Sequence, residues 1–187
     1  MSGRAFYRSD ELEGCMAGMA RRAYGLFPDP STLLVVGILR RGAPLADRLC
    51  AHLRGMWGVE RIERLDLDIK RYADDLTLLF PQTRLREAGE AQAIELAGRS
   101  VLLVDDVLYE GHSLLRAVEW LSRRGAAAVR SAVLVDRACA RLPMKADVAG
   151  ITLEVAPLQI VDVHVPPYES EFEIYINRRE EKDVRGS

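Results

Sequence analysis

Cysteine and histidine are scarce in this sequence, and the few present are scattered. Cys15, Cys50 and Cys139 are odd in number and far apart, which disfavours a disulfide framework and predicts buried, reduced thiols. The three histidines have no cysteine near them, so a zinc site is not expected. A hydrophobic core, rather than cross-links or a structural metal, is therefore expected to hold the fold together.

Long apolar runs, internal repeats and an excess of one charge are also missing. No segment has the length of a transmembrane helix or the make-up of a signal peptide, so no membrane partner is expected and the cytoplasm is the expected compartment. The net charge of −2 argues against a surface that coats nucleic acid, although a local basic face is compatible with it. The 187 residues, 49% of them hydrophobic, suit one globular domain.

Apolar runs that end at glycine, proline or acidic residues predict alternating helices and strands. The expected helices are residues 9–26, 44–54 and 113–124, and the expected strands are residues 33–38, 62–69, 100–104, 129–135, 151–155 and 172–176. Strand, helix and strand follow one another between residues 100 and 135, which is typical of a βαβ unit in a parallel sheet. The fold class is therefore α/β, with ligands expected at the carboxyl ends of the strands.

Two segments lack such a pattern. Residues 70–98 have weak periodicity, which predicts a lid over a site or, alternatively, a plain disordered surface loop. The charged residues 178–187 are expected to fray as a tail. Residues 1–177 are then expected to form the single domain.

The segment from Val101 to Ser113 combines an apolar strand, two adjacent carboxylates and a short glycine-containing loop that opens a helix. Backbone N–H groups at a helix N-terminus bind phosphate, and Asp105 and Asp106 can accept hydrogen bonds from the vicinal hydroxyls of a sugar. Two solvated acids in a turn would be the plainer interpretation. The strand, Gly111 and the immediate helix make the combination specific, and it predicts a site for a ribose 5-phosphate.

Two other strand ends carry polar residues. Arg40 and Arg41 lie between Gly37 and Gly42; the arginines can bind a pyrophosphate, and the glycines would let the backbone approach that ligand closely. Without the segment at 101–113, these would be two surface arginines on a helix-entry loop. Leu134–Arg137 ends a third strand, so three strand ends are expected to converge on one crevice.

These residues make the chain similar to the type I phosphoribosyltransferases, which use phosphoribosyl pyrophosphate (PRPP). It resembles in particular the PyrR family of pyrimidine operon attenuation proteins and uracil phosphoribosyltransferases. The similarity covers residues 33–151, and Tyr-Ala-Asp-Asp-Leu-Thr at 72–77 and Arg-Leu-Pro at 141–143 are typical of PyrR. The resemblance implies a central, mostly parallel sheet flanked by helices, with a flexible lid over about 71–98 and a small hood, in a homodimer or higher homo-oligomer.

The same resemblance implies roles for individual residues. PRPP would be bound by Asp105, Asp106, Val107, Leu108, Tyr109, Glu110, Gly111, His112 and Ser113. Its pyrophosphate would be bound by Leu39, Arg40, Arg41 and Gly42, the base by Asp136 and Arg137, and the lid would contribute Tyr72, Asp74 and Asp75. The catalytic residues would be Asp105, Asp106 and Arg137. Mg²⁺ would arrive with PRPP rather than in a dedicated protein site.

The sequence also departs from the family pattern. Glu110 and His112 replace a threonine and an arginine of the phosphate loop, Leu39 replaces a basic residue, and Ala138-Cys139 replaces Gly-His. A carboxylate about 5 Å from a phosphate charge costs roughly 3 kcal/mol per unit charge at an effective dielectric near 20. Glu110→Thr is therefore expected to tighten PRPP binding, unless Glu110 turns outward and pairs with an arginine.

Two functions follow. The first is Mg²⁺-dependent transfer of ribose 5-phosphate from PRPP to a pyrimidine-type base, with uracil the first candidate. Tyr109 stands where purine enzymes usually have an aspartate, and a phenol does not exchange protons at neutral pH. The second is a catalytically weak regulator that binds nucleotide and, with a basic face, RNA. The arginines that could form this face are interspersed with acids, which favours solvated helix surfaces; they are Arg4, Arg8, Arg21, Arg22 and Arg54.

Overall fold

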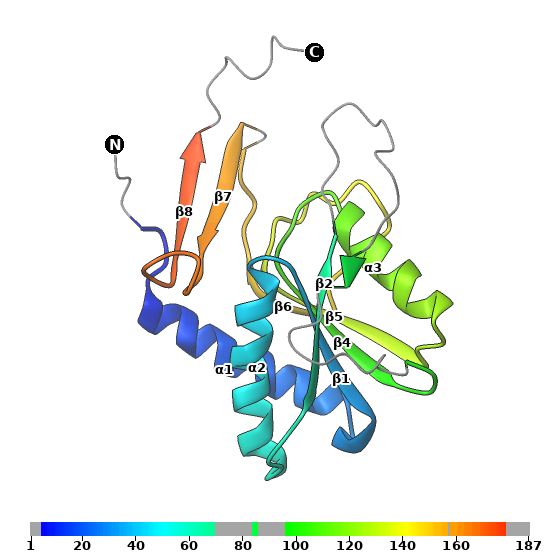
Figure 1. Ribbon diagram of the computed structural model, residues 1–187. Coiled ribbons are helices and arrows are strands. Elements are labelled where there is room, and N and C mark those ends of the chain that lie inside the picture. The colour runs from blue at the N-terminus through cyan, green and yellow to red at the C-terminus, as the bar shows by residue number, and fades with distance from the viewer. Residues whose placement is uncertain (1–4, 70–83, 86–95, 157, 179–187) are drawn as a thin grey trace.

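A six-stranded sheet forms the centre of the computed structural model, which describes residues 5–69, 84–85, 96–156 and 158–178 (Figure 1). Its strands lie in the order β3-β2-β1-β4-β5-β6. They are β1 (Leu33–Ile38), β2 (Glu63–Asp68), β3 (Arg84–Leu85), β4 (Ser100–Leu108), β5 (Ala128–Asp136) and β6 (Val148–Thr152). All neighbours pair in parallel except β3, which runs antiparallel to β2. The predicted parallel α/β sheet is confirmed.

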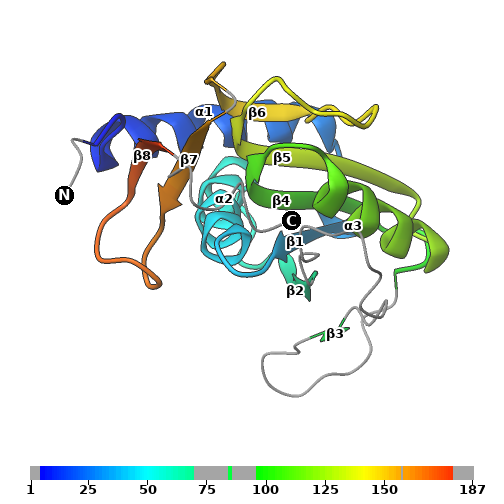
Figure 2. The same ribbon diagram turned by 90° about the horizontal axis from the view of Figure 1, so that it is seen from above.

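Helices cover both faces of this sheet (Figure 2). Helices α1 (Ser9–Leu26) and α2 (Gly42–Trp57) lie on one face, and α3 (His112–Arg123) lies on the other; a short 3-10 helix, η1 (Pro30–Thr32), leads into β1. Every residue of β1 is buried because its alternate side chains enter two cores. Leu33 and Val35 pack with α1 and α2, and Leu34 and Val36 pack with α3.

Two predicted elements are longer than the sequence suggested. Helix α2 continues past Arg54 to Trp57 and ends at Gly58, whose φ of 66° is a left-handed conformation that glycine adopts without strain. Strand β4 continues past Val104 to Leu108 because its pairing with β5 extends to Asp136. The two carboxylates at 105–106 therefore lie within the strand, not after it.

A second, two-stranded sheet stands apart from the first and forms the expected hood (Figure 1). Strand β7 (Gln159–His164) pairs antiparallel with β8 (Glu173–Arg178), and Tyr7 bridges to Ile174. β7 was not predicted. The strands expected at 151–155 and 172–176 are displaced to β6 and β8, because their pairing with β5 and β7 sets the boundaries.

Several expectations concern residues at the margins of the described structure. The lid predicted at 71–98 lies outside the described residues except for β3 and residues 96–98, and the predicted tail does so except for Arg178, the last residue of β8. Within the described ranges, no helix has both the length and the apolar character needed to cross a membrane.

The prediction of three buried thiols is wrong for Cys139, which is exposed on the loop after β5, and Cys15 is only half-buried. Cys50 is buried as expected. Burial raises the pKa of the Cys50 thiol to about 11, so this cysteine stays protonated and unreactive at neutral pH.

Candidate functional site

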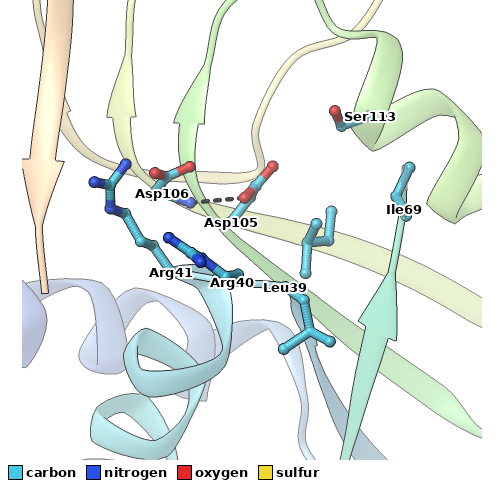
Figure 3. A pocket seen from close by; sticks show the side chains of 8 residues that line it. Leu39, Arg40, Arg41, Ile69, Asp105, Asp106 and Ser113 are labelled. Atoms are coloured by element: carbon cyan, nitrogen blue, oxygen red, sulfur yellow. Dashed lines mark hydrogen bonds between the residues drawn. The ribbon is translucent and has the colours of Figure 1, made fainter. Parts of the chain in front are cut away.

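A cavity of about 270 Å³ opens where the carboxyl ends of β1, β2 and β4 meet. Its walls come from the residues that follow β1, from the residue after β2, from the last part of β4 and from the first turn of α3 (Figure 3). The lining residues are Ile38, Leu39, Arg40, Arg41, Ile69, Asp105, Asp106 and Ser113. The cavity thus brings together two arginines, two carboxylates and a hydroxyl from distant parts of the chain.

The two carboxylates are held by the backbone that follows them. Asp105 Oδ1 accepts a hydrogen bond from the Asp106 N–H (2.9 Å), and Asp106 Oδ1 accepts one from the Val107 N–H (2.8 Å). Asp106 is only 5% exposed. A carboxylate oxygen can accept more than one hydrogen bond, so both groups keep the capacity to accept one from a ligand.

The glycines that flank the arginine loop serve the protein's own packing. A Cβ on Gly37 would lie 2.7 Å from the Cα of Ala43, and one on Gly42 would lie 2.5 Å from the carbonyl oxygen of Val104. Both glycines let the loop and the start of α2 approach β1 and β4, and the expected approach of their backbone to a ligand stays a prediction. The loop also contains a cis peptide between Leu39 and Arg40.

Both arginines of this loop contact the turn between β7 and β8. Arg41 donates to Glu169 Oε1 from Nη2 (2.7 Å) and Nε (3.2 Å), and its Nη2 lies 3.5 Å from Asp162 Oδ1. The guanidinium carbon of Arg40 lies 5.2 Å from the centre of the Tyr168 ring. Burial alone would lower the pKa of Arg41, but its bond to Glu169 and the carboxylates around it raise that pKa above its ordinary value.

The loop between β4 and α3 ends at Gly111, where the predicted helix begins. Gly111 has a φ of 91° and is the N-cap of α3, with no side-chain cap bond, so the first N–H groups of the helix have no partner within it. Glu110 places a carboxylate in this loop. Its Oε1 lies 3.3 Å from Arg141 Nε, and its Oε2 lies 3.7 Å from His112 Nε2. Glu110 therefore pairs with an arginine, the arrangement that lowers its expected cost to an anion.

The third strand end is organised by Asp136 and Arg137. Asp136 Oδ1 accepts a hydrogen bond from the Ala138 N–H (2.8 Å) and so closes a turn. Arg137 is 8% exposed and donates to the carbonyl oxygen of Gln159 (3.1 Å) at the start of β7. Its guanidinium carbon lies 4.3 Å from the centre of the Tyr109 ring, and its Nε finds no hydrogen-bond partner in the described part of the chain.

Comparison with known proteins agrees with this geometry. The model of the phosphoribosyl transferase domain matches residues 10–168. The bifunctional protein PyrR of Deinococcus radiodurans is 37% identical over 83% of this chain and 84% of its own length. The corresponding protein of Chloroflexus aurantiacus is 35% identical over 81% of this chain and 82% of its own length.

The chain belongs to the PyrR family of phosphoribosyltransferases. Solved structures agree on the fold. A hypoxanthine phosphoribosyltransferase of Trypanosoma cruzi superposes with a TM-score of 0.73 at 17% identity, covering 96% of this chain and 98% of its own. The same enzyme in complex with the product IMP gives a TM-score of 0.74 at 19% identity and covers 100% of this chain and 95% of its own.

The structure of this phosphoribosyltransferase brings some of the predicted site residues together and leaves others apart. Six of the predicted residues line the cavity: Leu39, Arg40, Arg41, Asp105, Asp106 and, across from them, Ser113 (Figure 3). Asp136 and Arg137 do not line it, and the predicted lid residues Tyr72, Asp74 and Asp75 lie outside the described residues.

Four residues that line the cavity or contact its arginines were not predicted from the sequence. Ile69 lines the cavity from the end of β2, and Asp162, Tyr168 and Glu169 contact the two arginines from the hood. Ile69 could have been found, because it ends a predicted strand beside the arginine loop. The three hood residues carry no local signal, since their contacts join segments that are far apart in the sequence.

Proposed function

We propose that this phosphoribosyltransferase transfers ribose 5-phosphate from PRPP to a pyrimidine-type base, with uracil as the first candidate, and releases pyrophosphate. The observation that carries the proposal is one cavity lined by Asp105 and Asp106, by Arg40 and Arg41, and by Ser113 (Figure 3). PRPP presents a diol, a pyrophosphate and a 5-phosphate. Carboxylates, guanidinium groups and a helix N-terminus with a hydroxyl match these three groups in turn.

In the proposed reaction, a ring nitrogen of the base forms a bond to C1 of the ribose, and the bond from C1 to the pyrophosphate oxygen breaks. The pyrophosphate leaves with the bonding electrons, and the base loses a proton to solvent. The transition state is oxocarbenium-like, so the residues act by positioning the sugar and stabilising charge. Asp105 and Asp106 would hold the ribose hydroxyls, while the loop before α3 would hold the 5-phosphate.

The base would lie near Tyr109 and Arg137. Arg137 is buried and stacks beneath the Tyr109 ring, and its Nε has no hydrogen-bond partner among the residues described here. A buried donor without a partner is costly unless a ligand supplies an acceptor. Because protein atoms cover this nitrogen, the support for a role of Arg137 in base binding is its place after β5, against the Tyr109 ring.

Mg²⁺ fits this site as a partner of PRPP. Magnesium prefers oxygen ligands and is commonly held by one or two carboxylates together with substrate phosphates, and Asp105 and Asp106 lie beside the proposed pyrophosphate position. When bound, the metal would offset the negative charge of the leaving group. The guanidinium groups of Arg40 and Arg41 would add positive charge on the other side.

A calorimetric titration of the full chain with PRPP and Mg²⁺ at neutral pH tests the proposal. Binding at micromolar strength is expected, followed by release of pyrophosphate when uracil is added and little release with hypoxanthine. Release with hypoxanthine but not uracil would contradict the choice of base. Folded protein that binds PRPP without releasing pyrophosphate would favour the alternative, a regulator that binds nucleotide or RNA.

The RNA alternative would rest on a basic face, and the structure describes four of the five arginines considered for it. Arg22 donates to the carbonyl oxygen of Ala149 at the exposed edge strand β6. This contact holds the Arg22 guanidinium against the protein. We place the transferase first because the cavity at the ends of β1 and β4 brings two carboxylates, two guanidinium groups and a hydroxyl together.

The pair of Glu110 with Arg141 makes a separate prediction about the phosphate loop. Arg141→Ala should weaken PRPP binding about three-fold, because an exposed ion pair contributes up to about 1 kcal/mol and its loss leaves a carboxylate free to face the 5-phosphate. Glu110→Thr should then tighten binding more in the Arg141→Ala protein than in the wild type. Calorimetry on the two single variants and the double variant measures this difference. Equal effects in both backgrounds would show that Arg141 does not restrain Glu110.

A further inference from the structure

The turn between β7 and β8 contacts the proposed pyrophosphate site from outside the main sheet. Tyr168 and Glu169 are consecutive residues of this turn, and each contacts one arginine of the loop after β1. The Arg41–Glu169 pair is partly sheltered from solvent: the exposed fractions of the two side chains are 30% and 18%. The hood is thus joined to the residues proposed to bind the leaving group.

Both carboxylate oxygens of Glu169 accept hydrogen bonds. Its Oε2 accepts a hydrogen bond from the Val165 N–H (2.8 Å), and its Oε1 accepts both bonds from Arg41. The turn is closed by hydrogen bonds from the N–H groups of Tyr168 (3.1 Å) and Glu169 (3.3 Å) to the carbonyl oxygen of Val165. The carboxylate is therefore held in place by the turn rather than by Arg41 alone.

The charges around Arg41 favour this contact. Besides Glu169, the carboxylates of Asp162 and Asp106 act on the same guanidinium. Burial alone would raise the pKa of Glu169, but the hydrogen bonds from Arg41 and Val165 and the charge of Arg41 lower that pKa below its ordinary value. At neutral pH the pair is therefore fully ionised.

The arrangement of the N–H donors on the Arg41 guanidinium determines which hydrogen bonds a pyrophosphate can accept from it. A guanidinium makes paired hydrogen bonds to an oxyanion through one of two edges, Nε with Nη2 or Nη1 with Nη2. Nη2 belongs to both edges. In Arg41 this nitrogen already donates to Glu169 and lies 3.5 Å from Asp162. Each edge uses a different hydrogen of Nη2, so a pyrophosphate can take the Nε–Nη2 edge of Arg41 only after Glu169 leaves it. At the Nη1–Nη2 edge it would meet the charge of Asp162, whose Oδ1 lies 3.5 Å from Nη2.

We propose that Glu169 is a positioning residue that competes with pyrophosphate for Arg41, so that the hood sets how tightly the pyrophosphate group of PRPP is bound. This inference rests on the proposed function. When the ligand binds, its oxygens replace the carboxylate on Arg41, and the turn at 165–169 is released from the loop after β1. The hood and the leaving-group site therefore respond to one another.

Binding of inorganic pyrophosphate with Mg²⁺ to the full chain, measured by calorimetry, tests the competition. Glu169→Gln should tighten binding about ten-fold, because it removes a competing charge that is partly sheltered from solvent. The glutamine carbonyl oxygen can still accept the bond from Val165, so the turn is kept. In an Arg41→Gln background the same change should alter binding less than two-fold, since the group competed for is absent.

Two further variants make the test specific. Glu171→Gln removes an equal charge from the same turn without touching Arg41, and it should change binding less than two-fold. Asp162→Asn replaces Glu169→Gln as the test variant if the latter does not fold, and it should tighten pyrophosphate binding two- to three-fold. Unchanged or weaker binding of pyrophosphate by folded Glu169→Gln protein would overturn the inference, because Glu169 would then be neutral or would support Arg41.

A ligand-free measurement separates this inference from the proposed function. In ¹H–¹⁵N spectra of the wild type, the Nε–H of Arg41 should give a slowly exchanging resonance that Glu169→Gln removes or shifts. No such resonance, in a protein that binds pyrophosphate, would overturn the inference alone. The resonance together with no binding of pyrophosphate or PRPP by any variant would overturn the proposed function and this inference with it.

Discussion

Replacing Asp105 and Asp106 together by asparagine should lower kcat/KM for PRPP by about a thousand-fold. Hydrogen bonds from ribose hydroxyls to charged acceptors contribute about 1.5–3 kcal/mol each. Two of them amount to about 4 kcal/mol, and each 1.4 kcal/mol corresponds to a factor of ten. The loss arises in catalysis because both carboxylates line the proposed ribose site.

The substitution is designed to spare the backbone. Asparagine keeps the oxygen that accepts the N–H of the following residue, which is the contact seen for Asp105 (2.9 Å) and Asp106 (2.8 Å). Pyrophosphate release gives the rate, and circular dichroism checks the fold. Asp147→Asn is the control, since this carboxylate bonds the Ser131 N–H (2.8 Å) just before β6 begins; its rate should change less than two-fold. A loss below ten-fold in the folded double variant would mean that the pair does not hold the ribose.

The central sheet could be predicted because its strands carry their signal locally. β1 is apolar at every position, since it is buried on both faces. The helix at 113–124 is followed by a glycine, which marks the end of that helix. The βαβ order then fixes which strand ends meet. For this reason the sequence predicts that the arginine loop, the two carboxylates and Ser113 lie at one site.

The hood shows where local signals were insufficient. Val161 and Val163 are buried while Asp162 and His164 between and beside them are not, an alternation that predicts a strand, yet β7 is only six residues long and follows an irregular segment. The contacts between the hood and the two arginines form only in the folded chain. Arg41 and Glu169 are 128 residues apart, so no spacing rule could join them.

Glu110 illustrates a different limit. The sequence allows an estimate of how much a carboxylate near the 5-phosphate would weaken PRPP binding. Whether Glu110 has that effect depends on where its side chain points. The pairing with Arg141 follows from a backbone contact, in which the Leu142 N–H donates to the Glu110 carbonyl oxygen (3.4 Å) and brings the neighbouring arginine alongside. Such a contact between two loops is set by the sheet that carries them, not by either loop alone.

The second large effect is expected from Gly42→Ala, which should lower the free energy of unfolding by about 3 kcal/mol and kcat/KM by about a hundred-fold. A Cβ at this position would lie 2.5 Å from the carbonyl oxygen of Val104 and 3.2 Å from the Cα of Asp105. Both are backbone atoms of β4, so no side chain can move aside. The loop with Arg40 and Arg41 must shift away from the carboxylates, and a shift of this kind separates the groups that would hold the pyrophosphate and the ribose of PRPP.

Gly55→Ala is the matched control for this substitution, because Gly55 lies in the same helix and has nothing within 4 Å of an added Cβ. Alanine there should raise the free energy of unfolding by about 0.5–1 kcal/mol and leave the rate unchanged. Denaturant unfolding and pyrophosphate release measure the two quantities. If Gly42→Ala kept the activity while losing stability, α2 could move from β4 without disturbing the site, and the close approach at Gly42 would serve packing alone. Loss of both, with Gly55→Ala gaining stability at full activity, would show that the contact between α2 and β4 sets the spacing of the arginines and the carboxylates.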